Sequence, residues 1–599
     1  MSVKTDQQFK GEGKMNRYIK FIVMSICILL AASGCKEDEI IPVLSGTGIS
    51  EISWNGPVAA DEEGEILSLT FSSEGKWTAE SSDPSWCRLL TENGVAGPAA
   101  LRIEVDLNVG VESRTASVEI SVEGYPESVV LEIVQSEGVT EKGDGRYREV
   151  NEWIYRRMSE NYLWNEPIPG LPLDYSLDYQ AFLKSILDGV SKSGDVNHDD
   201  GAYNQELRTE YYSQIISMAP ITRTTGQNER GNGFYRLRPV DLGKALGVVV
   251  DAVIPGGPAD RAGISRGHFI TEVNGIEITM DNYKSVTSKI YVDPVNLTLN
   301  TVRWEGEYLD KAVITKVGSV DLYPENYTDP AIYKAETVTL SNGTKVGYLL
   351  YMGFHTAYDE QLIEVFDKFK ADGVEELVLD FRYNNGGEIL SSTLMATMIA
   401  GQEHKGEILA KLTFNAQRTA AGEEASYRIG VPETKEYPDG YMLIEEGLRH
   451  SLDLDRVFVI TSGYTASASE IIINGLRGLG IEVNLVGTKT SGKNVGMEGY
   501  STSFRNYDFL LYPVTFYIEN AKGFRDYPEG FEPDLYLDDS GYYPGGDFGS
   551  NEDFLCNAVY GWIRTGKNPR PSKSSMELHF ESVPFMIDRK LGGSLVIYR

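Results

Sequence analysis

The chain has 599 residues, of which 41% are hydrophobic, 11% aromatic and 24% charged, and its formal net charge is −33 at pH 7. A chain of this length cannot bury its apolar residues in a single core, so we expect two to four domains, and the composition excludes a disordered protein. The negative charge excludes nucleic acid as a main partner, because an acidic surface repels phosphate groups.

The first segment has the order of a secretory signal. Two basic residues, Arg17 and Lys20, precede an apolar run over residues 21–32 that is short for a membrane span and ends in small residues. Cys35 follows directly, and this junction resembles a bacterial lipobox, in which the cysteine carries the lipid anchor. We interpret residues 1–34 as a lipoprotein signal peptide, with a plain cleaved signal as the alternative.

The residues that follow the proposed anchor indicate where the protein is exported. The tract over residues 36–39 is acidic and resembles the tag that sends some lipoproteins to the cell surface. We therefore expect an outer-membrane lipoprotein exposed at the cell surface, with the periplasmic face as the alternative. Beyond Cys27 and Cys35, only Cys87 and Cys556 remain, which predicts two buried free thiols rather than a disulfide framework.

Residues 45–138 have the pattern of an all-β sandwich. Runs with apolar residues at every second position lie between Gly, Asn and Ser turns, at residues 67–71, 101–105, 116–120 and 129–134. The segment resembles the BACON domain, an immunoglobulin-like module of bacterial surface lipoproteins. The residues that carry this resemblance are Trp77, Trp86, Cys87, Asn108, Arg114, Gln135 and Ser136. The resemblance implies contact with glycan or mucin; the alternative is a stalk whose Trp54, Trp77 and Trp86 pack in its core.

Residues 145–220 are predicted to form a small helical cap, because apolar residues recur at helical spacing over residues 150–158 and 179–187. Four residues of this segment occupy positions one, three, five and twelve of a calcium loop: Asp195, Asn197, Asp199 and Glu206. Asp200 stands at position six, where the sharp turn needs glycine. We therefore expect a solvated polar loop and no metal.

Residues 230–318 resemble a PDZ domain. The resemblance rests on residues 246–250, 254–259, 262–264 and 273–275. A turn at Leu246-Gly247 would expose backbone N–H groups beside a strand edge, where a peptide can add as a further strand. The predicted substrate-binding residues are Leu246, Gly247, Val248 and Val249.

Residues 335–565 alternate strands and helices. Continuous apolar strands are expected at residues 346–351, 377–381, 457–460 and 483–486. Such strands predict an α/β core whose sheet is covered on both faces, with its site at the carboxyl ends of the strands. Residues 401–445 and the tail after Lys567 give no assignment.

Three loops of this core carry chemistry. Gly386 and Gly387 follow one strand and permit backbone shapes that other residues resist. Ser467 opens a helix near its positive dipole end, a place suited to a nucleophile whose attack creates an oxyanion. Lys493 follows the next strand, and a lysine can act as a base when burial lowers its pKa from about 10.4.

Five motifs occur in the order of the C-terminal processing (tail-specific) peptidases, a family that joins a PDZ domain to an α/β core. They are Gly347-Tyr, residues 380–387, Ala466-Ser-Ala-Ser-Glu, Gly492-Lys493 and residues 530–534. The resemblance implies that Ser467 is the nucleophile, that Lys493 is the base, and that the amide of Ala468 with that of Gly386 or Gly387 forms the oxyanion hole. It implies polypeptide substrates. No zinc, paired-cysteine or phosphate-loop motif appears, so we expect no cofactor.

One position departs from that family. Met497 stands where many members carry a Gln that orients the lysine, so the group that orients Lys493 is unassigned. Glu470 is a candidate, but a nearby carboxylate would favour the charged lysine. Lys489 could also serve as the base in place of Lys493, and His355 could form a Ser–His pair with the nucleophile.

The predicted function is that of a serine endopeptidase acting on extracytoplasmic polypeptides by a Ser–Lys mechanism, with capture of the substrate by the PDZ domain. The alternative is a non-catalytic peptide- or glycan-binding surface lipoprotein.

Overall fold

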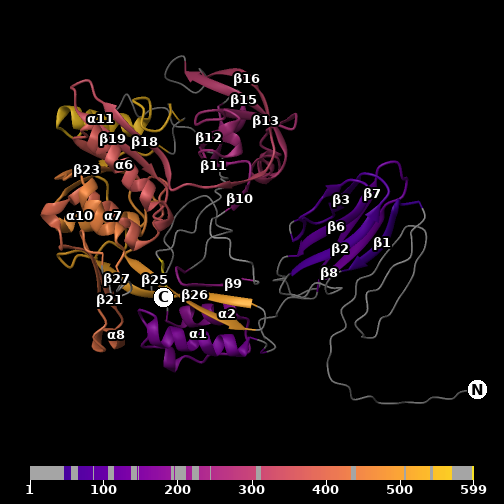
Figure 1. Cartoon of the computed structure of the whole chain (residues 1–599), viewed down its shortest axis with the longest axis horizontal. Helices are drawn as coiled ribbons and strands as arrows, with labels where there is room; N and C mark the ends of the chain where they lie inside the picture. Colours follow the sequence, from indigo (N-terminus) through magenta and orange to yellow (C-terminus); the bar gives the residue numbers. More distant parts are fainter. Residues whose placement is uncertain are drawn as a thin grey trace, which may run out of the picture. The chain divides into compact units, whose positions relative to one another are not determined.

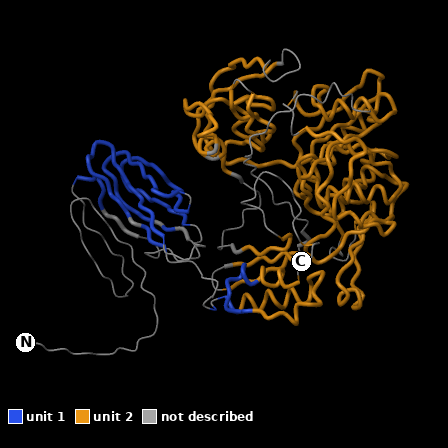
Figure 2. The backbone as a smooth tube through the Cα atoms, turned by 180° about the vertical axis from the view of Figure 1, so that it is seen from behind, with its two compact units in different colours: residues 1–148, 174–182 blue, residues 149–173, 183–599 orange. Residues whose placement is uncertain are grey.

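The computed structural model describes residues 46–54, 65–84, 86–105, 114–135, 145, 147–190, 195, 211–218, 228–242, 245–304, 312–432, 440–504, 507–539, 544, 546–569 and 596–598 (Figure 1). The predicted signal peptide, the anchor Cys35, and Asn197, Asp199 and Glu206 of the predicted loop lie outside the described residues. The chain divides into two compact units, residues 1–148 with 174–182 and residues 149–173 with 183–599 (Figure 2).

The first unit contains the predicted β-sandwich. Two antiparallel four-stranded sheets, ordered β1-β2-β6-β4 and β5-β3-β7-β8, share one apolar core. The strands are β1 (Ile49–Trp54), β2 (Glu65–Ser73), β3 (Trp77–Ser81), β4 (Cys87–Leu89), β5 (Asn93–Gly94), β6 (Gly97–Val105), β7 (Arg114–Val122) and β8 (Val129–Gln135). Trp77 and Trp86 are buried in this core, which fits the interpretation that these two rings pack inside the domain.

The predicted cap contains helices and a strand. Its helices are α1 (Arg148–Asn161), η1 (Ile168–Gly170) and α2 (Tyr179–Val190). The helical prediction is wrong for residues 214–218, which form strand β9 (Gln214–Met218) because they pair with β26 (Tyr507–Tyr512) of the core. The prediction of a solvated loop is wrong for Asp195, whose side chain is completely buried.

The PDZ-like module is built on an antiparallel sheet in the order β11-β12-β13-β15-β16, with β14 beside β13. Its strands are β11 (Phe234–Asp241), β12 (Leu246–Val253), β13 (Phe269–Val273), β14 (Ile276–Glu277), β15 (Val295–Trp304) and β16 (Ala312–Leu322). Its short helices are α3 (Pro258–Arg261), α4 (Tyr283–Thr287) and α5 (Lys289–Val292). A separate ribbon pairs β10 (Asn228–Gly231) with β17 (Glu325–Thr328).

The core sheet has the order β18-β19-β20-β23-β24-β28 and is parallel except for β18. Its strands are β18 (Ile332–Thr339), β19 (Lys345–Tyr351), β20 (Glu376–Asp380), β23 (Arg456–Thr461), β24 (Glu482–Gly487) and β28 (Leu535–Tyr536). The helices around it are α6 (Asp359–Asp372), α7 (Ile389–Ala400), α10 (Ala468–Leu479) and α11 (Phe554–Thr565). One apolar cluster joins the sheet to α6, α7 and α10 and a second joins it to α11, so both faces are covered, as predicted (Figure 1).

A second core sheet contains segments for which the sequence pattern gives no assignment. Its order is β22-β21-β27-β25-β26-β9, with β29 beside β25. The strands not yet named are β21 (Ile408–Phe414), β22 (Ala425–Arg428), β25 (Val495–Phe504), β27 (Val514–Glu519) and β29 (Val596–Tyr598). The remaining short helices are η4 (Thr356–Tyr358), η5 (Gln402–His404), α8 (Ala416–Ala420), α9 (Leu443–Glu446) and η6 (Gly447–His450). Lys493 lies two residues before β25, so this sheet anchors the loop of the predicted base.

Cys87 and Cys556 are free and buried, as predicted. No helix within the described ranges is long and apolar enough to cross a membrane.

Candidate active site

The predicted nucleophile lies on a strained turn between β23 and α10. Ser467 has a φ of +58°, a region that residues other than glycine rarely adopt and that costs about 1–3 kcal/mol. The residue is completely buried, and its Oγ makes no hydrogen bond with any described residue. Its backbone N–H donates to Glu470 Oε2 at 3.0 Å. The turn has the arrangement of a capping box, with the N–H of Glu470 directed at Ser467 Oγ, but no described contact of this Oγ meets hydrogen-bond geometry.

The glycine loop after β20 lies against this turn. Gly386 has a φ of +109°, and a Cβ on it would lie 2.7 Å from Ser467 Cβ. Gly387 has a φ of +137°, and a Cβ on it would lie 2.1 Å from the carbonyl oxygen of Phe354. Both the backbone conformation and the space therefore require glycine at these two positions.

The two loops are joined by hydrogen bonds to one carbonyl group. Ser469 Oγ and the N–H of Ala466 donate to the carbonyl oxygen of Asn384 at 3.0 and 3.2 Å. The Asn384 side chain in turn accepts from the N–H of Gly386 at 2.9 Å. The backbone carbonyl and side chain of Asn384 thus fix the spacing between the glycine loop (residues 381–387) and the nucleophile turn (residues 462–467).

The two glycine amides differ in what they can bind. The N–H of Gly386 is used by Asn384, whereas the N–H groups of Gly387 and Ala468 donate to no acceptor among the residues that the structure describes. The position of a Cβ on Gly386 would be 2.9 Å from Ala468 N, so the open Ala468 amide borders the glycine loop. The family resemblance admits either glycine; the hydrogen bonds favour Gly387.

The predicted base reaches the same region from the next strand. The carboxyl ends of β20, β23 and β24 are adjacent, and Lys493 lies in the loop after β24. Its side chain is buried, and its Nζ lies 4.7 Å from the centroid of the Tyr212 ring. Lys489, the second candidate base, has a side chain that is 43% exposed and pairs with Glu532 at 3.5 Å. Of the two lysines, Lys493 is therefore the one enclosed by the protein.

Glu470 links the nucleophile turn to the lysine loop. Its Oε2 accepts from the N–H groups of Ser467 and Lys493, and its Oε1 accepts from Thr490 Oγ1 and from the N–H of Gly492, all at 2.7–3.0 Å. Burial raises the pKa of Glu470 to about 7, against the effect of these hydrogen bonds. One carboxylate oxygen thus accepts from the backbones of both the predicted nucleophile and the predicted base.

Neither Met497 nor His355, which the sequence also singles out, is one of the four described donors to the Glu470 carboxylate. Met497 is completely buried in β25, where it pairs with Val514. His355 is exposed and precedes η4.

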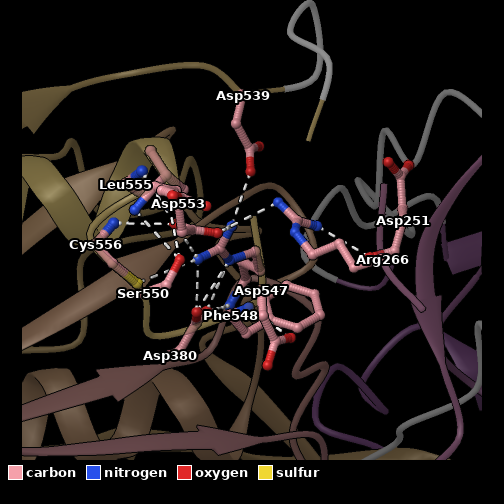
Figure 3. Close-up of polar contacts among 12 residues, drawn as sticks. Asp251, Arg266, Asp380, Asp539, Asp547, Phe548, Ser550, Asp553, Leu555 and Cys556 are labelled. Atoms are coloured by element: carbon pink, nitrogen blue, oxygen red, sulfur yellow. Dashed lines mark hydrogen bonds and ion pairs between the residues drawn. The ribbon is translucent and has the colours of Figure 1, made fainter. Parts of the chain in front are cut away.

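A buried ion cluster includes Asp380, at the end of β20, and Asp553 (Figure 3). Arg382 is 1% exposed and donates to the carboxylates of Asp380, Asp539 and Asp553 at 2.7–3.1 Å. Arg266 of the PDZ-like module pairs with Asp553 at 3.3 Å. Burial opposes ionisation of Asp553, but Arg382 and then Arg266 hold its pKa well below the usual range.

Only one part of this cluster is visible in the sequence. An arginine two residues after Asp380, at the end of an apolar strand, is a signal of a buried pair. Asp539 and Asp553 lie 157 and 171 residues beyond that arginine, in segments without a pattern of their own. Sequence reasoning therefore missed them.

The predicted peptide site on β12 requires an open strand edge there, and this part of the prediction is wrong. Leu246, Gly247, Val248 and Val249 pair with β11, and Val248 and Val249 pair also with β13. β12 is therefore an interior strand, and the edges of the described sheet are β11 and β16. The sequence pattern indicates β12 rather than β11 as the edge strand. The reason is that the proline and two arginines of β11 are typical of a loop.

The edge strand β11 contacts the glycine loop and the turn that carries Ser467. The hydroxyl of Tyr235 donates to the carbonyl oxygen of Tyr383 at 3.3 Å. The guanidinium of Arg236 lies 5.1 Å from the ring centroids of Tyr383, in the glycine loop, and of Tyr464, in the nucleophile turn. The PDZ-like module therefore touches the loops that carry Gly387 and Ser467.

Four segments of the chain match family models. Residues 345–537 match peptidase family S41 and residues 149–208 match the peptidase S41 N-terminal domain. The chain carries an S41 peptidase domain. Residues 249–290 match a PDZ domain and residues 75–136 match BACON, an N-terminal binding domain. The predicted resemblance and the predicted multidomain fold are confirmed.

Solved structures agree with this assignment. A structure from Bacteroides fragilis NCTC 9343, assigned to the S41 proteases, is 28% identical, with a TM-score of 0.54 over 69% of this chain and 97% of its own. The photosystem II D1 C-terminal processing protease is 18% identical, with a TM-score of 0.36 over 65% of this chain and 93% of its own. No curated protein matches the chain. With its S41 and PDZ domains, the chain is a serine-type peptidase, as predicted.

Proposed function

We propose that the protein is an endopeptidase that cleaves extracytoplasmic polypeptides with Ser467 as nucleophile and Lys493 as general base. The observation that carries this proposal is the carboxylate of Glu470, one oxygen of which accepts from the backbone N–H of both residues. A second support is the buried Oγ of Ser467, which faces no competing hydrogen-bond partner among the described residues.

The proposed reaction follows from the groups around Ser467. Neutral Lys493 takes the proton of Ser467 Oγ as this oxygen attacks the scissile carbonyl carbon. The N–H groups of Ala468 and Gly387, which have no described acceptor, bind the oxyanion that forms. Lys493 then gives its proton to the leaving amine, and a water molecule activated by Lys493 hydrolyses the acyl-enzyme.

The proposed capture site for the polypeptide is the edge of β11. A peptide adds to a sheet through an unpaired strand edge, and β12 has none. β11 is preferred to the opposite edge, β16, because Tyr235 and Arg236 of β11 contact the glycine loop and the nucleophile turn. A chain held at β11 would therefore lie beside the machinery that cleaves it.

The location of the enzyme is proposed from the sequence alone. Residues 1–34 resemble a lipoprotein signal and Cys35 would carry the lipid, with the acidic residues 36–39 directing the protein to the cell surface. Labelling of cells with an alkyne fatty acid should tag the wild type and not Cys35→Ser. Loss of the protein from intact cells on treatment with external protease would support surface exposure.

The test of the activity uses residues 36–599 and an unfolded protein substrate. Wild type, Ser467→Ala and Lys493→Ala are compared by mass spectrometry of the fragments, with circular dichroism to check folding. We expect cleavage by the wild type and a loss of at least about 10³-fold in both variants, the usual effect of removing one member of a catalytic unit. A fluorophosphonate probe should label Ser467 and no other residue.

Two outcomes would contradict the proposal. Full activity of Lys493→Ala would assign the base to another residue, and His355→Ala would then be tested. A folded wild type that neither cleaves nor takes the probe would favour a binding protein. The burial of Trp77 and Trp86 removes these two rings from a glycan site.

A further inference from the structure

Lys493 lies over an aromatic ring supplied by the segment that precedes the PDZ-like module. Its Nζ is 4.7 Å from the centroid of the Tyr212 ring, and both side chains are buried. The face of a tyrosine ring carries partial negative charge and attracts an ammonium group. The ring therefore defines a position for the end of the lysine side chain.

A buried carboxylate accompanies this ring. The N–H of Tyr212 donates to the carbonyl oxygen of Asp195 at 2.7 Å. The Asp195 carboxylate accepts from Tyr162 Oη at 2.8 Å, and from the Oγ and N–H of Ser213 at 2.7 and 2.8 Å. Burial raises the pKa of Asp195 to about 6, while these hydrogen bonds and the charge of Lys493 oppose the rise. The three donors favour the ionised form of this carboxylate, and its charge acts electrostatically on Lys493.

The carboxylate is also tied to the strand that follows the lysine. Ser213 Oγ, which donates to Asp195, accepts from the N–H of Val514 at 2.9 Å. Val514 pairs with Met497 in β25, the strand that starts two residues after Lys493. Asp195 and the lysine loop are thus held in one frame.

We propose that Asp195 and Tyr212 are the positioning residues of Lys493 and take the role that Met497 cannot fill. The inference rests on the proposed Ser–Lys mechanism. When Lys493 accepts the proton of Ser467 Oγ it becomes an ammonium, and the ring and the carboxylate stabilise that charge until the proton passes to the leaving amine. The buried Asp of a Ser–His–Asp triad stabilises the imidazolium in the same way.

The carboxylate has two opposite effects that an experiment can separate. It favours the ammonium form of the free enzyme, so it lowers the fraction of neutral base at a given pH. It also stabilises the ammonium that forms during acylation. At high pH the lysine is neutral in any case, and only the second effect counts. Removing the charge should therefore lower the high-pH rate and move the acidic limb of the profile to lower pH.

Further titratable groups face this pair and remain in the variant. Glu470 binds the backbone N–H of Lys493 and Tyr162 donates to Asp195. The pKa of Glu470 is raised to about 7 by burial, and Glu470 is present in wild type and variant alike. A difference between their profiles therefore reports the charge of Asp195.

The first experiment measures kcat/KM against pH for the wild type, Asp195→Asn and Asp188→Asn. Asp188 is a matched control: it lies on α2, loses the same charge, and has a side chain that is 50% exposed. It accepts a hydrogen bond from the hydroxyl of Tyr211 at 2.6 Å, which the amide oxygen of Asp188→Asn can still accept. We expect Asp195→Asn to lower the high-pH value by about 10–100-fold and to move the acidic limb down by about one pH unit. Asp188→Asn should keep the wild-type profile. A drop in rate with an unmoved limb would assign Asp195 a merely structural role and overturn the proposal.

The second experiment tests the ring, and it stands even if Asp195→Asn does not fold. Tyr212→Phe keeps the ring and should retain kcat within about threefold, while Tyr212→Leu should lose roughly tenfold in kcat with little change in KM. A folded Tyr212→Leu with full kcat would overturn the role of the ring. Full activity of Lys493→Ala would instead overturn the Ser–Lys mechanism, so the two failures are distinguishable.

Discussion

Two buried polar centres adjoin the glycine loop, and they differ in whether their polar groups have hydrogen-bond or ion-pair partners. In the Arg382 cluster one guanidinium meets three carboxylates, and a second arginine, Arg266, adds to the neutralisation. At Ser467 the hydroxyl and two neighbouring amides have no described partner, and the backbone is strained. The protein satisfies the polar groups that hold the loop, and it leaves unsatisfied the groups that would meet a substrate.

The energies of the two centres explain this difference. A buried ion pair is costly to desolvate, so the Arg382 cluster adds little to stability compared with an apolar core of the same shape. Its effect is to specify where the loop of residues 380–387 lies relative to the PDZ-like module. The strain at Ser467 persists only because surrounding contacts, such as those of Glu470, hold the turn in place.

The largest effect is expected from breaking the satisfied centre. Arg382→Leu leaves Asp380 and Asp553 buried with much of their charge uncompensated. Removing one partner of a buried ion pair costs about 3–5 kcal/mol in the free energy of unfolding, and the leucine cannot offset this. Urea unfolding followed by tryptophan fluorescence measures the loss, and activity should fall because the glycine loop is no longer held.

An exposed ion pair provides the control for that variant. Lys405 pairs with Glu445 at 3.1 Å, and their side chains are 38% and 47% exposed. Lys405→Ala should change the free energy of unfolding by no more than about 1 kcal/mol. Equal losses in Arg382→Leu and Lys405→Ala would show that the buried cluster does not hold the loop.

Much of the architecture is predictable from patterns in the sequence. The strands expected at residues 346–351, 377–381, 457–460 and 483–486 form close to their predicted bounds, because a strand buried on both faces reads as a continuous apolar run. The turn that carries Ser467 and the paired glycines can also be predicted from the sequence, because few other residue types fit these positions.

The parts that sequence reasoning missed depend on contacts between distant segments. A PDZ motif gives no register, and only the pairing with β11 shows β12 to be interior. The polar neighbours of Asp195 predict a solvated loop, yet Tyr162 and Ser213 enclose it. Residues 408–414 and 425–428 form strands through pairing in a sheet that also takes strands from before the PDZ-like module and from the end of the chain.

A moderate effect is expected from filling the space beside the unsatisfied centre. A Cβ at Gly386 would lie 2.7 Å from Ser467 Cβ and 2.9 Å from Ala468 N. Gly386→Ala should therefore displace the nucleophile turn and lower kcat by about 100-fold, since small misplacements of reacting groups are costly. The measurement is the rate of peptide cleavage at saturating substrate.

Gly343→Ala separates the clash from the backbone strain. Gly343 also has a positive φ, +91°, but nothing lies within 4 Å of a Cβ on it. This variant should lose about 1 kcal/mol of stability and keep its kcat. If Gly386→Ala behaved like Gly343→Ala, the contact with Ser467 would have no role in catalysis.

The smallest effect is expected at Glu470, which joins the turn of Ser467 to the loop of Lys493. Glu470→Gln replaces one carboxylate oxygen by an NH₂ group, so two of the four donors lose their acceptor. We expect a roughly tenfold lower kcat, because nucleophile and base stay in place but are held less firmly. Peptide cleavage over a range of pH checks both this loss and the pH dependence that follows.

The pH dependence of Glu470 has opposite signs for activity and for stability. Its pKa is raised by burial from 4.5 to about 7, so the folded state binds more protons than the unfolded state between these values. Its contribution to the free energy of unfolding therefore falls as pH rises through this window. Activity needs the ionised form, which accepts all four hydrogen bonds, so activity should fall as pH drops below about 7. Glu470→Gln should make the free energy of unfolding fall less between pH values of about 5 and about 7.5 in urea unfolding. The remaining slope comes from other buried carboxyl groups with a raised pKa, such as Asp195 and Asp359. An unchanged slope would mean that Glu470 is already ionised throughout, and that the carboxylate holds both loops at every pH where the enzyme is folded.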